Sequence, residues 1–232
     1  MIIFLLILSV ISGVILGKFF GSKEKFAKNL LVLSAGFLIT ICVNEVFPTV
    51  YTSENHSNIG LFVIGGVLLQ MLLENLTKGF EHGHFHHEHD HQSILPLALM
   101  VGMFIHAFIE GIPLANEKEV FSPYLLGILF HNLPISFVLG VFLFKKKVTY
   151  PGILIVTLFA LSSPLGMVLG NYFNPEWQPY FLAIVGGIFL HISSVIIFES
   201  NKNHKMDWVK ILLVIVGVLL AGASHLFHHH EH

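Results

Sequence analysis

Eight long apolar segments, separated by mostly short polar connections, are the feature that most constrains how this chain can fold. An apolar run of about 18 residues or more can cross the hydrocarbon core of a bilayer as a helix. Backbone polar groups in lipid are satisfied only in helices or closed barrels, and these runs are too long and continuous for barrel strands. The sequence therefore predicts an all-α integral membrane protein, a single transmembrane domain over residues 1–232, with eight transmembrane helices: Ile2–Phe20, Asn29–Val50, Ile59–Leu76, Ile94–Ala115, Pro123–Phe144, Pro151–Tyr172, Gln178–Phe198 and Trp208–Phe227.

The composition agrees with a chain that has the lipid bilayer as its surroundings. Charged residues make up 11% of the sequence, against about 25% in an ordinary soluble domain, which is too few to cover a soluble globule. The formal net charge is −2, and a nucleic-acid partner would call for an excess of positive charge. We therefore expect a membrane protein without a nucleic-acid partner.

The distribution of lysine predicts the orientation in the membrane. All 12 basic residues are Lys. All but Lys118 lie at the C-terminal end of an odd-numbered segment, in the loop after it or, for Lys210, just inside the eighth segment. Loops rich in Lys and Arg face the cytoplasm. A signal peptide carries basic residues before its apolar part, and no basic residue precedes Ile2–Phe20. This segment is therefore expected to be the first span. The odd-numbered loops are thus expected in the cytoplasm and both termini outside, in a plasma or inner membrane.

The longest connection, residues 79–93 between the third and fourth segments, is rich in histidine interleaved with carboxylates. Tracts of this composition commonly bind metal in an exchangeable way, and the alternative is a merely polar loop. The lysine distribution places this loop in the cytoplasm. Its candidate ligands are His82, His84, His86, His87, His89 and His91.

Ionisable residues inside membrane segments are costly, so they are candidates for function. His106 and Glu110 lie four residues apart on the fourth segment, and Met103 precedes them by one turn. Side chains at this spacing share one face of a helix, where an imidazole and a carboxylate can hold one divalent ion or hydrogen-bond to each other. The fifth segment adds His131 and Asn132, which are also ligand types for transition metals.

Prolines and further polar residues complete the set of candidates. Pro113 and Pro134 each remove a helical hydrogen bond near the candidate ligands, and broken helices recur at the binding sites of transporters. The alternative is a plain packing kink. Glu45 near the end of the second segment, and His191 and Glu199 on the seventh, are further candidate ligands, although each also suits a structural or interfacial role.

These residues resemble the motifs of the ZIP (Zrt/Irt-like protein) family of divalent metal transporters. Residues 106–111 read His-Ala-Phe-Ile-Glu-Gly, similar to the family's His-Asn-x-x-Glu/Asp-Gly signature. Residues 131–134 read His-Asn-Leu-Pro, similar to the family's His/Gln-Glu/Asp-x-Pro motif. The resemblance implies a ZIP-like bundle with a metal site between helices 4 and 5, and a transporter rather than an enzyme. It implies that the protein has no cofactor and that the transported substrate is Zn²⁺, or alternatively Fe²⁺ or Mn²⁺, moving toward the cytoplasm. It also implies that a homodimer is a possible assembly.

The chain departs from the family pattern at three positions. Ala107 replaces an Asn, Asn132 replaces an acidic residue, and Ile135 stands where the family has a second His or Glu. Family members often hold two metal ions bridged by carboxylates between these helices. The remaining His106, Glu110 and His131 suffice for one ion, so we expect a site for a single metal.

Two other functions fit parts of the sequence. A zinc-dependent intramembrane hydrolase would use a metal-bound water, and His225 and His229 form an HxxxH pair, although no His-Glu-x-x-His motif is present. A metal-sensing homologue that does not transport is the other alternative, because the chain lacks several of the family's ligands.

Overall fold

A computed structural model of the protein describes residues 1–21, 24–52, 58–77, 97–145, 150–199 and 207–229. All regular secondary structure in these residues is helical. The principal helices are α1 (Ile2–Phe20), α2 (Glu24–Ile41), α3 (Phe47–Thr52), α4 (Ile59–Thr77), α5 (Leu97–Gly111), α6 (Pro123–Lys145), α7 (Tyr150–Gly170), α8 (Gln178–Glu199) and α9 (Trp208–His229). A π-helix, η1 (Cys42–Val46), joins α2 to α3, and the 3₁₀ helices η3 (Ile112–Asn116) and η4 (Pro175–Trp177) follow α5 and precede α8.

The helices confirm an all-helical membrane bundle, and each predicted segment is helical where it is described, apart from Asn171 and Tyr172, which lie in a turn beyond the end of α7 at Gly170. In the described residues, six helical stretches are long and apolar enough to cross a membrane, and two apolar helices are shorter, Met100–Asn116 and Trp208–Ser224. The second helix begins at Glu24, earlier than the predicted Asn29, and continues through η1 and α3 to Thr52. Polar residues that favour helices precede its apolar part, which hydrophobicity alone does not detect.

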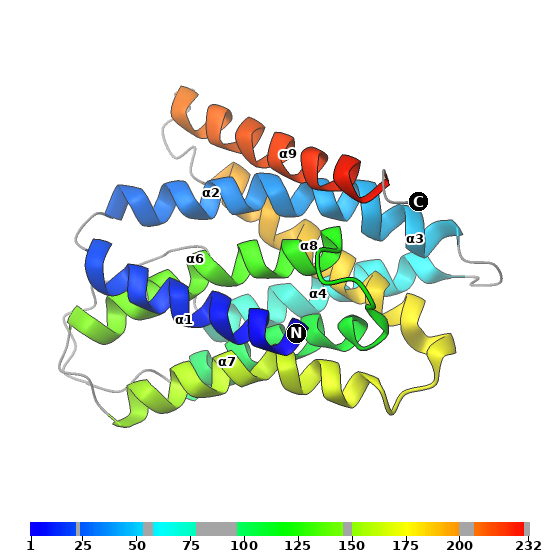
Figure 1. Ribbon diagram of the computed structural model, residues 1–232, viewed down its shortest axis with the longest axis horizontal. Coiled ribbons are helices and arrows are strands. Elements are labelled where there is room, and N and C mark those ends of the chain that lie inside the picture. The colour runs from blue at the N-terminus through cyan, green and yellow to red at the C-terminus, as the bar shows by residue number, and fades with distance from the viewer. Residues whose placement is uncertain (22–23, 53–57, 78–96, 146–149, 200–206, 230–232) are drawn as a thin grey trace.

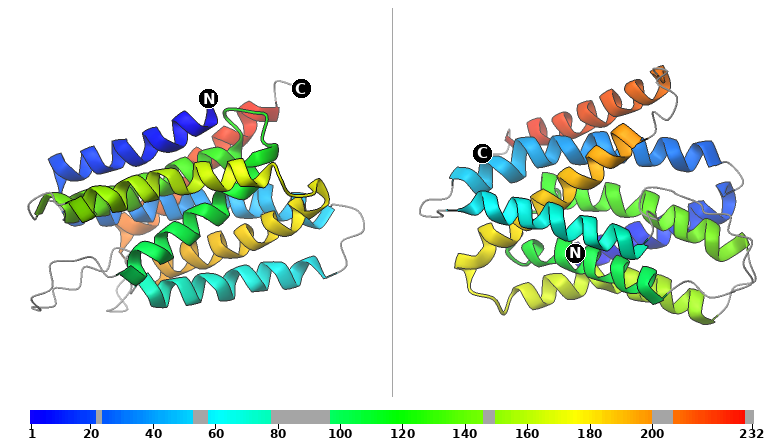
Figure 2. Two further views of the ribbon diagram at one scale, coloured as in Figure 1. Left: turned by 90° about the horizontal axis from the view of Figure 1, so that it is seen from below. Right: turned by 180° about the vertical axis from the view of Figure 1, so that it is seen from behind.

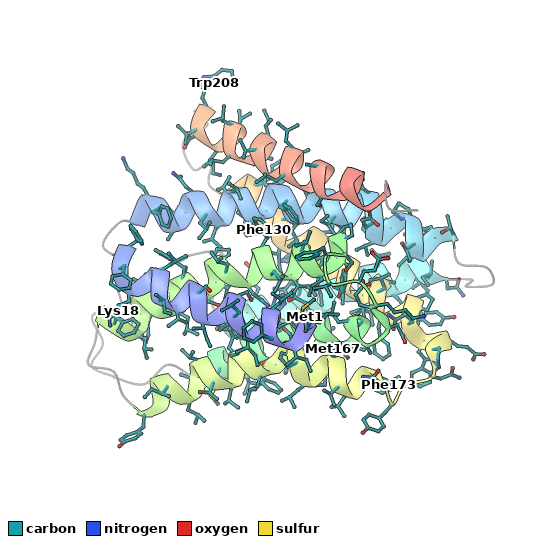
Figure 3. All side chains as sticks on the ribbon, in the orientation of Figure 1. Met1, Lys18, Phe130, Met167, Phe173 and Trp208 are labelled. Carbon is teal, nitrogen blue, oxygen red and sulfur yellow. The ribbon has the colours of Figure 1, made fainter. Side chains whose placement is uncertain are left out.

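The helices pack as neighbours in four main pairs, α1 with α6, α2 with α9, α4 with α8 and α5 with α7. Their axes run roughly along the long dimension of the molecule (Figure 1). The views from below and from behind show the same bundle of roughly aligned helices (Figure 2). Helix α1 begins and α9 ends toward the same end of the bundle (Figure 1). Lys18 and Phe173 lie toward opposite ends (Figure 3).

Two glycines allow the close approach of α4 and α8. A Cβ atom on Gly66 would overlap the carbonyl oxygen of Ile184, and one on Gly187 would overlap the carbonyl oxygen of Val63. Small residues at such contacts let helix backbones come together in membrane proteins. This approach matters for the site, because polar side chains of α4 lie one and two turns beyond Gly66.

Two prolines coincide with changes in helix geometry, and a third does not. In η1 the N–H of Phe47 donates to the carbonyl of Cys42, five residues earlier, just before Pro48, which has no N–H to donate. Pro113 lies where α5 gives way to η3. Pro134, in contrast, lies inside α6, which continues from Pro123 to Lys145. The expected interruption therefore occurs beside Glu110 at the end of α5, whereas α6 remains one helix past His131.

Candidate metal centre

Three buried side chains from α5 and α6 converge at one point in the bundle. The Nε2 atom of His106 lies 2.9 Å from an Oε1 atom of Glu110 and 3.4 Å from the Nε2 atom of His131. The same Oε1 atom lies 4.0 Å from Nε2 of His131. One potential ligand atom from each residue falls within 4.8 Å of the others, close enough to hold one metal ion. The side chains are 0–1% exposed.

The local structure explains why these side chains meet. His106 and Glu110 lie one turn apart on the same face of α5, as their spacing predicts. The hydroxyl of Tyr124, near the start of α6, donates a 2.8 Å hydrogen bond to the carbonyl oxygen of Glu110 and so ties α6 to the end of α5. His131 follows two turns later on α6, and Phe130, which directly precedes it, lies roughly midway along the length of the bundle (Figure 3).

The Glu110 carboxylate is buried between two imidazoles. Its side chain is fully buried, and its Oε1 atom lies 2.9 Å from Nε2 of His106. The contacts that the structure gives it are the two imidazole nitrogens. Burying an ionised carboxylate is costly unless it is paired. The cluster is therefore suited to bind a cation between one carboxylate and two imidazoles.

Asn132 and Met103 also lie in the interior, with different surroundings. Asn132 is 1% exposed, and its side-chain oxygen has no hydrogen-bond partner among the described residues. An amide oxygen left in this state beside His131 remains a candidate ligand. Met103 is 1% exposed and belongs to an apolar cluster that includes Val10 and Ile155.

The same apolar cluster occupies two positions where the family pattern has polar residues. Ala107 and Ile135 are 0% and 1% exposed, and both pack with Met103 in this cluster. An apolar contact surface therefore takes the place of the polar groups expected there from the family motif. The arrangement leaves Glu110 as the carboxylate of the three-residue group.

The remaining candidates lie away from this group. Glu45 is on the π-helix η1, partly buried, and is not a member of the cluster. His191 on α8 pairs with Glu74 on α4, with Nε2 2.8 Å from Oε2, so its partner is a carboxylate and not the cluster. Glu199 is the last residue of α8, and its side chain lies outside the described part of the chain. The loop candidates His82, His84, His86, His87, His89 and His91 also lie outside the described residues.

Sequence reasoning missed two polar residues of α4 that the structure places near these groups. The side-chain oxygen of Gln70 lies 3.0 Å from Nδ1 of His106, and Gln70 is 0% exposed. Glu74, one turn further along α4, holds His191. Their spacing of four residues in an otherwise apolar segment repeats the pattern of His106 and Glu110, and this signal was available in the sequence.

The fold and the cluster together define a helical membrane protein with a buried group of potential metal ligands between two of its helices. The family model of the ZIP zinc transporter matches residues 82–225, which is more than half of the chain. The protein therefore belongs to the ZIP zinc transporter family, as the motifs in its fourth and fifth apolar segments indicate.

Two relatives illustrate the similarity. The protein zntD of Dictyostelium discoideum is 25% identical over 177 residues, which cover 65% of this chain and 26% of that protein. The chain thus spans about a quarter of the length of the Dictyostelium protein. An uncharacterized protein of Methanocaldococcus jannaschii is 25% identical over 217 residues, which cover 87% of this chain and 88% of the relative.

Proposed function

We propose that this protein carries divalent transition-metal ions, Zn²⁺ before Fe²⁺ or Mn²⁺, across a membrane toward the cytoplasm. The observation that carries the proposal is the convergence of His106, Glu110 and His131 within 4.8 Å in the interior of the bundle. Imidazole and carboxylate ligands suit several first-row divalent ions. With neutral imidazoles, one such ion and the Glu110 carboxylate leave about one unit of net positive charge, far less than a bare divalent ion.

The route that we propose runs from this cluster along α4 toward the histidine-rich loop. Glu74 and His191 form a second carboxylate–imidazole pair, 14% exposed at the histidine and 28% at the glutamate. Glu74 lies one turn beyond Gln70 and one turn before Thr77, after which the loop leaves α4. An ion leaving the buried cluster in this direction would meet ligands of the same chemical types, first in the partly exposed pair and then in residues 79–93.

The direction rests on the distribution of lysine. Lys18 lies toward one end of the bundle (Figure 3). Lys118 is in the connection between η3 and α6, which lies on the other side of the membrane if each preceding predicted segment crosses it once. By the enrichment of lysine in cytoplasmic loops, we assign the Lys18 end to the cytoplasm of a plasma or inner membrane and both termini to the outside. We propose a homodimer as the assembly, because members of this family are often dimeric.

Transport by purified protein in lipid vesicles tests the proposal. Vesicles that enclose a zinc-sensitive dye should fill with zinc when they contain the wild-type protein, and His131→Ala and Glu110→Ala should each abolish the signal. Glu176→Ala is the matched control, because this carboxylate is exposed beyond α7. Normal zinc flux through both cluster variants would contradict the assignment of the site, and absence of flux in the wild type would contradict transport itself.

A further inference from the structure

We propose that Gln70 is a positioning residue of the metal site, which holds His106 in the one tautomer that can bind the ion. This inference rests on the proposed function, because it gives the orientation of a ligand for the transported metal. Gln70 belongs to α4, outside the two helices that supply the cluster, and it lies outside both family motifs described above.

The hydrogen bond between the two side chains determines where the imidazole carries its hydrogen. Oε1 of Gln70 lies 3.0 Å from Nδ1 of His106. A carbonyl oxygen of an amide can only accept a hydrogen bond, so Nδ1 must be the donor. A neutral imidazole has a single N–H, and Nε2 of His106 is therefore left with its lone pair.

That lone pair points to the place where the ion would bind. Nε2 of His106 is the atom that lies 2.9 Å from Glu110 and 3.4 Å from His131. The other tautomer would direct an N–H group at this point, which excludes coordination by His106. In the competent tautomer the lone pair of Nε2 faces the Glu110 carboxylate oxygen at 2.9 Å, and a cation bound between these two acceptors would satisfy both of them. Gln70 thus selects the competent tautomer without touching the ion.

The surroundings of Gln70 support a fixed and specific contact. Its side chain is 0% exposed. The backbones of α4 and α8 approach each other closely one turn before Gln70, because a Cβ atom on Gly66 would overlap the carbonyl oxygen of Ile184. An amide is also a neutral acceptor, so it orients His106 without adding a second buried negative charge next to Glu110. Partners that orient a metal-binding histidine in this way commonly contribute strongly to affinity.

Zinc uptake by vesicles containing full-length variants separates positioning from packing. Gln70→Leu keeps nearly the same volume but cannot accept a hydrogen bond, and Gln70→Glu restores an acceptor. Gln178→Leu is the matched control, because the amide of Gln178 donates a 2.7 Å hydrogen bond to the carbonyl of Pro113 and also links α8 to the α5–η3 helix. We expect Gln70→Leu to raise the KM for zinc about tenfold to hundredfold, Gln70→Glu to recover most of this loss, and Gln178→Leu to leave KM unchanged.

Nitrogen-15 NMR of histidine-labelled, zinc-loaded wild-type protein reads the tautomer directly, and this measurement does not depend on the folding of either Gln70 variant. Its His106 signals, assigned by their loss in His106→Asn, should show the hydrogen on Nδ1. A hydrogen on Nε2, or a KM that Gln70→Leu changes no more than Gln178→Leu does, would overturn the positioning role. Wild-type protein that takes up no zinc would instead contradict the proposed function on which this inference rests.

Discussion

Replacing Glu110 by glutamine tests how far one carboxylate supports the metal site. The substitution keeps the size of the side chain and one neutral oxygen ligand, but it removes the negative charge from a fully buried position. The cluster then offers two imidazoles and an amide, and no formal charge compensates the ion. We expect metal binding to weaken strongly while the fold is retained, because the helices still pack around a side chain of the same shape.

The magnitude follows from the size of the cluster. Its ligand atoms lie within 4.8 Å of one another, so an ion among them is at most about 4 Å from the carboxylate. Two unit charges at about 4 Å interact with about 4 kcal/mol at an effective dielectric constant of about 20, and a divalent ion doubles this to about 8 kcal/mol. The amide oxygen and local relaxation recover part of the difference. A loss of about 4 kcal/mol corresponds to a dissociation constant roughly a thousandfold higher.

Competition with a chromophoric zinc chelator measures this constant in purified protein. The background should lack the histidines of residues 79–93 and 228–232, because these would bind zinc independently of the membrane site. Glu176→Gln in the same background is the control for loss of one carboxylate. If Glu110→Gln raises the dissociation constant less than tenfold, the carboxylate is not the main source of charge compensation, and the reasoning fails.

Four further outcomes follow from the sequence and the structure. A cysteine introduced at Phe85 should react with an impermeant reagent only after cells are opened, since labelling from outside would reverse the proposed orientation. Replacing the loop histidines together should leave substantial transport at saturating metal, and complete loss of flux in a well-expressed variant would make the loop part of the essential site. Anomalous diffraction on protein without the histidine tracts should show one zinc ion between α5 and α6, and two fully occupied peaks would refute the one-metal site. Gly66→Leu should destabilise the protein by about 1–3 kcal/mol in thermal unfolding because α4 and α8 must separate, whereas Gly65→Leu, which faces open space, should have little effect.

The fold was largely predictable because membrane helices have a strong local signal. Apolar runs located all the principal helices, since each must satisfy its backbone within itself and present apolar side chains to lipid. The start of α2 was less accessible, because Glu24 and Lys25 are polar residues at the beginning of a helix that hydrophobicity does not reveal. The π-helix η1 also has no simple signature apart from Pro48.

The central site was predictable for a related reason. An ionisable residue in an apolar segment is conspicuous, and the spacing of His106 and Glu110 places both on one helix face. His131 was a candidate because of its residue type in an apolar segment, and the resemblance to a family supported its place in the same site, because the sequence of α6 does not indicate which helix lies opposite. The structure supplies that contact at 3.4 Å between the two histidines. Gln70 and Glu74 show the same limit, since their partners His106 and His191 are on other helices.

The residues that differ from the family pattern have a structural consequence that links stoichiometry to affinity. Ala107 and Ile135 are not isolated losses of ligands, because both are buried in one apolar cluster with Met103. A second ion in this region would have to lie against hydrocarbon, and it would repel the first ion with no additional carboxylate in the cluster to compensate. The one ion that we propose would be bound by two imidazoles, which protons also bind. We therefore expect zinc to be held less tightly than in a site with several carboxylates and to be released readily by acid. In the proposed route, the next carboxylate–imidazole pair is that of Glu74 and His191. Weak binding of the ion in the buried cluster favours its transfer to this pair.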